Sequence, residues 1–228
     1  MKDVTRRDFI FDGALITGAA ITTLAIGVAV VSPGTARAAK AVFPESRCGV
    51  ENKNGRRVLI AYGSYCGSTA GVAESIGKVL CDNGATVDIR RVESVRDLSP
   101  YQAVIIGSAV HSGKWLPNAA QFVETNQNIL SKKPTAYFLT CLALYKSNKE
   151  TRRIAQSYME PMLEAVPRVR PVDIGLFAGV LDYGTLSFVV RMVMKSKMKK
   201  KGVPEGDHRD WDAIRSWAEG LCPKLLHA

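Results

Sequence analysis

The sequence lacks the short motifs that mark several common kinds of functional site. Its five cysteines include no CxxC pair and form no cluster with the three histidines, so no metal site is predicted. The glycine-rich loop at residues 63–71 has no lysine and no GxGxxG spacing, which excludes a Walker-type loop and a dinucleotide fingerprint. Internal repeats and low-complexity tracts are absent, and no signature of a nucleic-acid-binding fold occurs, so no nucleic-acid partner is expected.

The N-terminus has the composition of an export signal. Arg6-Arg7 precede a nearly uncharged stretch at 11–31, and Ala36 and Ala38 form a small-x-small cleavage site. The arginine pair resembles the signal that the twin-arginine translocase reads on folded proteins. We therefore expect residues 1–38 to be removed and the protein to work in the periplasm or at the outer face of the cytoplasmic membrane. An uncut anchor is the alternative, because 11–31 is long enough to span a bilayer.

The remaining 190 residues have the size of one domain and hold nine of the ten net positive charges, because residues 1–38 carry four basic and three acidic side chains. A basic balance suits an acidic partner or a membrane surface. All five cysteines lie in this part. Export permits disulfides, but spacing alone indicates none, so we expect free thiols.

Short apolar runs alternate with helical patterns along this part of the chain. The runs predict strands at 58–62, 86–92, 103–107, 136–142 and 172–180, with the second at the edge of the sheet because it is polar at alternate positions. Helices are predicted at 69–83, from 117 to about 129, at 150–166 with an interruption at Pro161, and at 211–221. Residues 39–56 are predicted to be a linker and residues 57–228 an α/β domain, an open parallel five-stranded sheet with helices on both faces.

The loop GSYCGSTAG, at 63–71, joins the first strand to the first helix. It offers hydroxyls and backbone N–H groups but no charge. A helix N-terminus binds phosphate through such groups without a cation, and ligands of open α/β sheets bind at the carboxyl ends of strands. The loop alone fits a phosphate site or an ordinary tight turn.

The loop resembles the flavodoxin motif Ser/Thr-x-Thr-Gly-x-Thr, with Ser64, Gly67 and Thr69 in place and Cys66 at the middle hydroxyl. The segments at 106–123 and 177–183 and the Asp-Trp pair at 210–211 resemble the flavodoxin-like, menaquinone-dependent protoporphyrinogen oxidases. The resemblance runs from about residue 58 to 221. It implies the strand order 2-1-3-4-5 and FMN as cofactor.

The resemblance also implies the residues that bind FMN. The phosphate loop comprises Ser64, Tyr65, Cys66, Gly67, Ser68 and Thr69. The flavin ring is held by Ser108, Ala109, Val110, His111, Ser112, Gly113, Trp115, Thr140, Cys141 and Leu142.

This chain departs from the family pattern beside the flavin ring. The family tends to carry a basic residue and an aromatic residue where this chain has His111 and Ser112. We therefore expect Trp115 to replace the stacking aromatic side chain, or that face of the ring to be open to a partner. His111 is the candidate for hydrogen bonding to the ring or for passing protons.

After the fifth strand, the segment at 186–201 begins apolar and ends with lysines. This suits an amphipathic helix that touches acyl chains and anionic head groups. A helix packed on the domain and a methionine-rich surface for a redox protein partner are the alternatives. The predicted contacts are Phe188, Arg191, Met192, Lys195, Lys197, Met198, Lys199, Lys200 and Lys201.

Two functions fit these features. The first is an exported FMN oxidoreductase that passes electrons between a protoporphyrinogen-like substrate and a membrane quinone. Its location weakens the porphyrin assignment, because porphyrin synthesis is expected inside the cell. The second is a non-enzymatic electron carrier or an FMN-free binding module.

Overall fold

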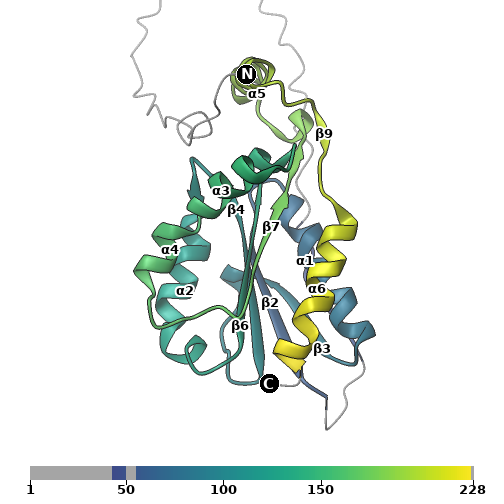
Figure 1. The fold of residues 1–228 in the computed structure, drawn as a ribbon, viewed down its shortest axis with the longest axis vertical. Coiled ribbons are helices and arrows are strands. Elements are labelled where there is room, and N and C mark those ends of the chain that lie inside the picture. Colours follow the sequence, from purple (N-terminus) through teal and green to yellow (C-terminus); the bar gives the residue numbers. More distant parts are fainter. Residues whose placement is uncertain (1–42, 50–54, 227–228) are drawn as a thin grey trace, which may run out of the picture.

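The computed structural model describes residues 43–49 and 55–226 (Figure 1). Arg6, Arg7, Ala36 and Ala38 lie outside these ranges, so the export signal stays a prediction. Among the described residues, no helix combines the length and the apolar character needed to cross a bilayer.

Five parallel strands form the centre of one sheet, in the order β3-β2-β4-β6-β7. This is the predicted order 2-1-3-4-5, so the prediction of a flavodoxin-like α/β fold is confirmed. The inner strands are apolar and buried over most of their length because helices cover both faces of the sheet. The strands are β2 (Arg57–Gly63), β3 (Thr86–Arg91), β4 (Ala103–His111), β6 (Thr135–Cys141) and β7 (Ile174–Ala178).

Each face of the sheet has its own apolar core. On one face Phe122 and Ile154 pack with the side chains of alternate strand residues, and on the other face Ile76 and Ile214 do so. Figure 1 shows the two helical layers on either side of the sheet. The first layer holds α2 (Pro117–Leu130), α3 (Lys149–Ser157) and α4 (Glu160–Ala165), and the second holds α1 (Ser68–Asp82) and α6 (Trp211–Leu226).

Part of the predicted linker belongs to the sheet. β1 (Ser46–Cys48) pairs antiparallel with β3, so β3 is not the edge strand that its polar alternation predicted. Cys48 and Cys81 form a disulfide with a Cα–Cα distance of 6.1 Å, which corrects the expectation of free thiols. The disulfide holds β1 against α1, and the added strand covers the open edge of the sheet.

The helix predicted at 150–166 is two helices. α3 begins with a capping box, in which Asn148 and Thr151 each accept a hydrogen bond from the other's backbone N–H. α4 begins at Glu160 and has Pro161 in its first turn. Proline cannot donate the hydrogen bond that a continuous helix needs at this position, but it fits a first turn.

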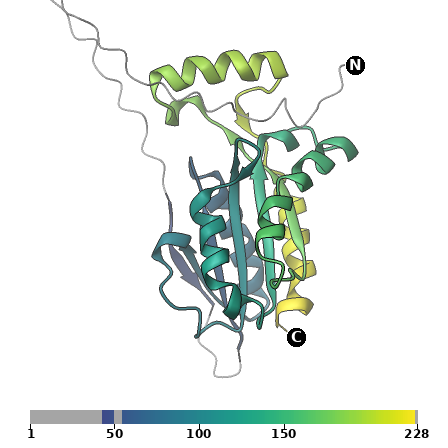
Figure 2. The same ribbon diagram turned by 90° about the vertical axis from the view of Figure 1, so that its left-hand side faces the viewer.

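An insert follows β7 and lies beyond the carboxyl ends of the strands. It contains β8 (Val180–Leu181), α5 (Phe188–Lys201) and β9 (Gly206–Asp207), and β8 pairs antiparallel with β9. Figure 2 shows α5 lying across the end of the sheet. The insert has a small core of its own, which joins α5 to the loop after β6 and consists of Leu181, Tyr183, Met198 and Val203 with partly buried Leu142, Tyr145, Leu186 and Met194.

Candidate functional site

The glycine-rich loop leaves the first turn of α1 open to an anion. Gly67 adopts a left-handed conformation with φ 87°, no side chain caps the helix, and the first turn holds no acidic residue. The backbone N–H groups of a first turn have no partners within the helix, and the helix dipole favours negative charge there. This end of α1 therefore has the geometry and electrostatics of a phosphate site.

Two of the predicted hydroxyl donors also have structural roles. The Ser64 hydroxyl accepts a hydrogen bond from the Gly67 N–H at 3.0 Å, which closes the loop. The buried Thr69 hydroxyl lies 2.8 Å from the Thr140 hydroxyl and joins the loop to β6. Ser68 is partly exposed at the start of α1.

The thiols around the site are neutral. Burial raises the pKa of Cys66, a hydrogen bond with Thr185 partly offsets this, and the nearby Asp182 raises the pKa further. Burial raises the pKa of Cys141 to about 12. A protonated thiol adds no negative charge beside a phosphate, so Cys66 is compatible with an anion in the loop.

The last glycine of the loop makes room for an arginine. A Cβ at Gly71 would lie 2.5 Å from Nη1 of Arg209, and that nitrogen donates a hydrogen bond to the Ser68 carbonyl at 3.2 Å. Asp207 of β9 pairs with the same guanidinium at 2.6 Å, and the Trp211 ring lies 4.3 Å below it. The insert is thus tied to the first turn of α1. No sequence pattern indicated this, because Arg209 and Ser68 are 141 residues apart.

The predicted ring-binding loop after the third parallel strand is a β-hairpin. β4 continues to His111 and pairs with β5 (Lys114–Trp115). Ser112 and Gly113 have φ of 51° and 72°, which is the type I′ turn of a two-residue hairpin. The buried Ser108 hydroxyl accepts a hydrogen bond from the Leu116 N–H at 3.0 Å and donates one to the Ala109 carbonyl. Ser108 thus fixes the hairpin.

Trp115 is buried, contrary to the expectation that it replaces the stacking aromatic side chain. Its side chain is 5% exposed, its Nε1 donates to the Met159 sulfur at 3.0 Å, and its ring meets Tyr137 edge-on. Trp115 pairs with Val110 across the hairpin, so the two side chains lie on the same side of the ribbon. This side of the ribbon packs onto the core. The hairpin turn itself offers no aromatic ring.

Two rings from different loops meet at the surface of the site. Tyr65 of the glycine-rich loop stacks on His111 at 5.5 Å with an interplanar angle of 17°. Tyr65 is 63% exposed, and His111 is exposed. The structure therefore brings His111, the candidate for proton transfer, beside the predicted phosphate loop.

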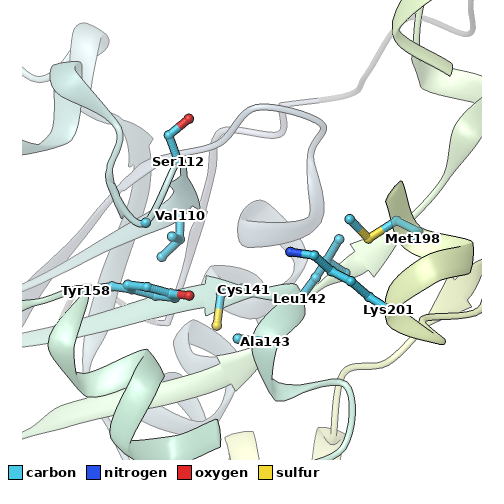
Figure 3. Close-up of a pocket in the computed structure, with 9 residues that line it drawn as sticks. Val110, Ser112, Cys141, Leu142, Ala143, Tyr158, Met198 and Lys201 are labelled. Carbon is cyan, nitrogen blue, oxygen red and sulfur yellow. The ribbon is translucent and has the colours of Figure 1, made fainter. Parts of the chain in front are cut away.

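A pocket lies between the hairpin turn, the loop after β6 and α5 (Figure 3), and we call it the ring pocket. Five of its residues are among those predicted to bind the flavin ring, namely Val110, Ser112, Gly113, Cys141 and Leu142. The other four lining residues were not predicted to bind it, namely Ala143, Tyr158, Met198 and Lys201. Tyr158 has no distinguishing pattern in the sequence, and it reaches the pocket because α3 packs against the loop after β6 and against β7.

The surface of α5 is divided along its length. Its first six residues include five large exposed apolar side chains: Phe188, which is 73% exposed, Met192, which is 60% exposed, and Val189, Val190 and Val193. Lys195, Lys199 and Lys200 are exposed toward the other end. Met198 is buried in the core of the insert, and Arg191 and Lys197 are partly buried. The predicted amphipathic helix therefore has an apolar end and a basic end rather than two opposite faces.

The described residues of the site fit FMN. The described ranges contain no group of three or more histidine, cysteine, aspartate or glutamate side chains that could hold an ion. The open first turn of α1 suits the phosphate, and the mostly apolar pocket suits a flat ring. Both lie at the carboxyl ends of the parallel strands, where such folds bind ligands.

Comparisons with known proteins agree with this assignment. Residues 59–207 match the flavodoxin domain family. The protoporphyrinogen IX dehydrogenase [quinone] of Leishmania major is 26% identical, with 71% of this chain and 73% of that protein covered. The enzyme of the same name from Escherichia coli K12 is 25% identical, with 72% and 94% covered.

Among solved structures, oxidised flavodoxin 2 from Bacillus cereus is 20% identical, with 74% of this chain and 99% of that chain covered and a TM-score of 0.46. The family match spans more than half of the sequence. The chain therefore belongs to the flavodoxin domain family and is, in its general class, an FMN-binding oxidoreductase.

Proposed function

We propose that this protein is an exported, quinone-linked FMN oxidoreductase that works at an anionic membrane surface. It would oxidise a protoporphyrinogen-like substrate and pass the electrons to a membrane quinone. One observation carries this proposal: the ring pocket is lined on one side by α5, and the same helix exposes an apolar end and a basic end. The names of the two relatives from Leishmania major and Escherichia coli support the substrate and the acceptor.

Residues of the two loops would hold FMN at its two ends. The Ser64 and Ser68 hydroxyls and the backbone N–H groups of the first turn of α1 would bind the phosphate. Val110 and Leu142 would contact the ring across the pocket. FMN supplies the redox chemistry, since it accepts and passes on electrons in hydride or single-electron transfers. The chain contributes orientation, a largely apolar environment and, at His111, an imidazole that can donate or accept a proton.

The length of the exposed apolar surface supports a lipid partner for α5. Isolated exposed apolar residues are ordinary, but a contiguous cluster such as the one from Phe188 to Val193 marks an interaction surface. The adjacent lysines complement anionic head groups. A helix lying across the end of the sheet can place its apolar end among acyl chains while Lys199 and Lys200 stay at the head groups. The ring pocket, which is lined by Met198 and Lys201 at the basic end of α5, would then lie at the membrane surface beside the quinone pool.

Export fits the same picture. A twin-arginine signal carries folded proteins, so FMN could be loaded before transport. The Cys48–Cys81 disulfide is typical of proteins in oxidising compartments. The predicted signal and the disulfide together support a location in the periplasm or at the outer face of the cytoplasmic membrane.

Quinone turnover tests the proposed function. Protein exported through its own signal is expected to show flavin absorption bands and to release about one FMN per chain. Under anaerobic conditions, its reduced flavin should be reoxidised by menadione over many turnovers, with protoporphyrinogen IX as the trial donor and porphyrin fluorescence as the readout. Bound FMN with no quinone turnover would identify an electron carrier instead. Protein that neither contains nor takes up FMN would be a binding module.

Binding to vesicles tests the role of α5. Wild-type protein should bind vesicles that contain phosphatidylglycerol much more tightly than vesicles of phosphatidylcholine alone. Replacing Lys199 and Lys200 with glutamine should cost about 2 kcal/mol, or roughly 30-fold in affinity, because each lysine near an anionic surface is worth about 1 kcal/mol. Sedimentation with the vesicles measures the bound fraction.

The matched control removes two exposed lysines far from α5. Lys78→Gln with Lys132→Gln, near the end of α1 and just after α2, lowers the net charge equally and should leave vesicle binding within about twofold of wild type. All variants share the same N-terminal segment, so any contribution from residues 1–38 cancels. Equal losses in the two double variants would indicate a general charge effect and contradict the proposed contact. Equal binding to vesicles with and without phosphatidylglycerol would point to a protein partner for α5.

A further inference from the structure

The ring pocket contains one charged residue. Of its nine lining residues, eight are uncharged side chains or glycine, and the ninth is Lys201 from the last turn of α5. In Figure 3 the ammonium group of Lys201 points toward the space between Ser112, Tyr158 and Cys141. The pKa of the Cys141 thiol is raised to about 12 by burial, so this thiol is neutral at physiological pH.

The fold holds Lys201 in this direction. Met198 is 2% exposed in the core of the insert, and Lys201 follows three residues later on the same face of α5. Gly202 ends the helix in a left-handed conformation, with φ 66°, directly after Lys201. Lys199 and Lys200 are exposed, whereas Lys201 is half-buried. The three lysines therefore share the same helix end, but only Lys201 lines the pocket.

We propose that Lys201 sets the electron affinity of the bound flavin by placing a positive charge beside its ring. This inference rests on the proposed function, because it requires FMN in the pocket. A two-electron-reduced flavin carries negative charge on its pyrimidine side when N1 is unprotonated. A nearby cation in a site of low dielectric stabilises that form over the neutral oxidised ring, and so it raises the reduction potential. Lys201 thus makes the flavin a better electron acceptor for the substrate.

A simpler role for Lys201 makes a different prediction. Any lysine in the last turn of a helix stabilises the helix dipole, and Lys199 and Lys200 do this as well as Lys201. A role in the dipole alone gives similar effects for all three lysines. A role in the pocket gives an effect for Lys201 alone.

Sulfite binding to the FMN-loaded protein distinguishes these roles. Sulfite bonds to flavin N5 and leaves negative charge on the ring, so its affinity reports on positive charge nearby without any substrate. Lys201→Met is expected to weaken sulfite binding roughly tenfold or more and to lower the midpoint potential of the flavin. Lys201→Arg should keep both values near wild type, because it keeps the charge.

The matched control is Lys200→Met, which removes the same charge from the same helix end and should leave both values unchanged. Equal sulfite affinities and potentials in Lys201→Met and wild type would overturn the inference. If FMN binds and quinone turns over in that case, the proposed function still stands. Protein without FMN would overturn the proposed function, and the inference with it.

Discussion

Removing the Cys48–Cys81 disulfide is expected to lower the free energy of unfolding by about 3–4 kcal/mol. The two residues are 33 positions apart, and a crosslink closing a loop of that length restricts the unfolded chain by about this amount. The native state should also lose the anchor that holds β1 on β3, because β1 has only three residues. Urea unfolding of wild type and of Cys48→Ala with Cys81→Ala measures the difference.

The other cysteines provide the control for this experiment. A reductant should destabilise wild type to the level of the double variant but should not change the double variant, since Cys66, Cys141 and Cys222 are free. Cys66→Ala should keep the full response to the reductant. Wild type that is insensitive to reductant and as stable as the double variant would contradict a structural disulfide.

Replacing Asp88 with asparagine is expected to cost about 3 kcal/mol of stability. Asp88 is 1% exposed, and its Oδ2 accepts hydrogen bonds from Arg57 Nη2 at 2.7 Å and from the Tyr101 hydroxyl at 2.9 Å. Its Oδ1 lies 3.2 Å from Nε of Arg47 in β1. Breaking a buried ion pair costs roughly 3–5 kcal/mol, and the lower end applies because both arginines reach solvent.

The loss should depend on pH in a defined direction. Burial of Asp88 raises its pKa, but the hydrogen bonds from Arg57 and Tyr101 and the charges of Arg57 and Arg47 outweigh burial, so the pKa lies below the usual value. A lowered pKa stabilises the fold above the unfolded pKa of about 4, and this contribution is lost as the pH falls through the folded pKa. The gap between wild type and Asp88→Asn should thus be constant from about pH 5 to 8 and shrink in acid.

Asp82→Asn is the control for the ion pair. Asp82 pairs with Lys78 on the outer face of α1, where both side chains are mostly exposed. Such surface pairs are worth at most about 1 kcal/mol, so this variant should unfold close to wild type. A loss at Asp88 no larger than the loss at Asp82 would show that the ion pair does not anchor β1 and β3.

These two features stabilise the end of the sheet where the chain enters the domain, far from the cofactor site. Cys48 and Arg47 both belong to β1, and both hold it to elements of the flavodoxin core. Their loss should therefore lower stability while leaving the potential of the flavin unchanged. The reverse is expected for Lys201, because it lies half-buried at the end of α5: its replacement should change the potential of the flavin and leave stability near wild type.

Local patterns in the sequence determined the parallel core and the position of the phosphate loop. The apolar runs at 103–106 in β4 and 136–139 in β6 have no polar alternation, and such a run predicts burial on both faces without reference to any partner. The turn at Gly67 and the start of α1 are also local, because the conformation of a few residues decides them. These predictions needed no knowledge of which segments meet.

Only the tertiary structure decided which side chains share a site. The disulfide, the burial of Trp115 against Met159, the contact of Arg209 with Ser68 and the pocket position of Lys201 each join segments far apart in the sequence. A side chain's type and spacing do not encode such contacts, which depend on strand order, register and helix packing together. For that reason the sequence predicted a membrane, domain or partner contact for the lysine-rich segment but not a place in the cofactor pocket, toward which the fold turns Lys201.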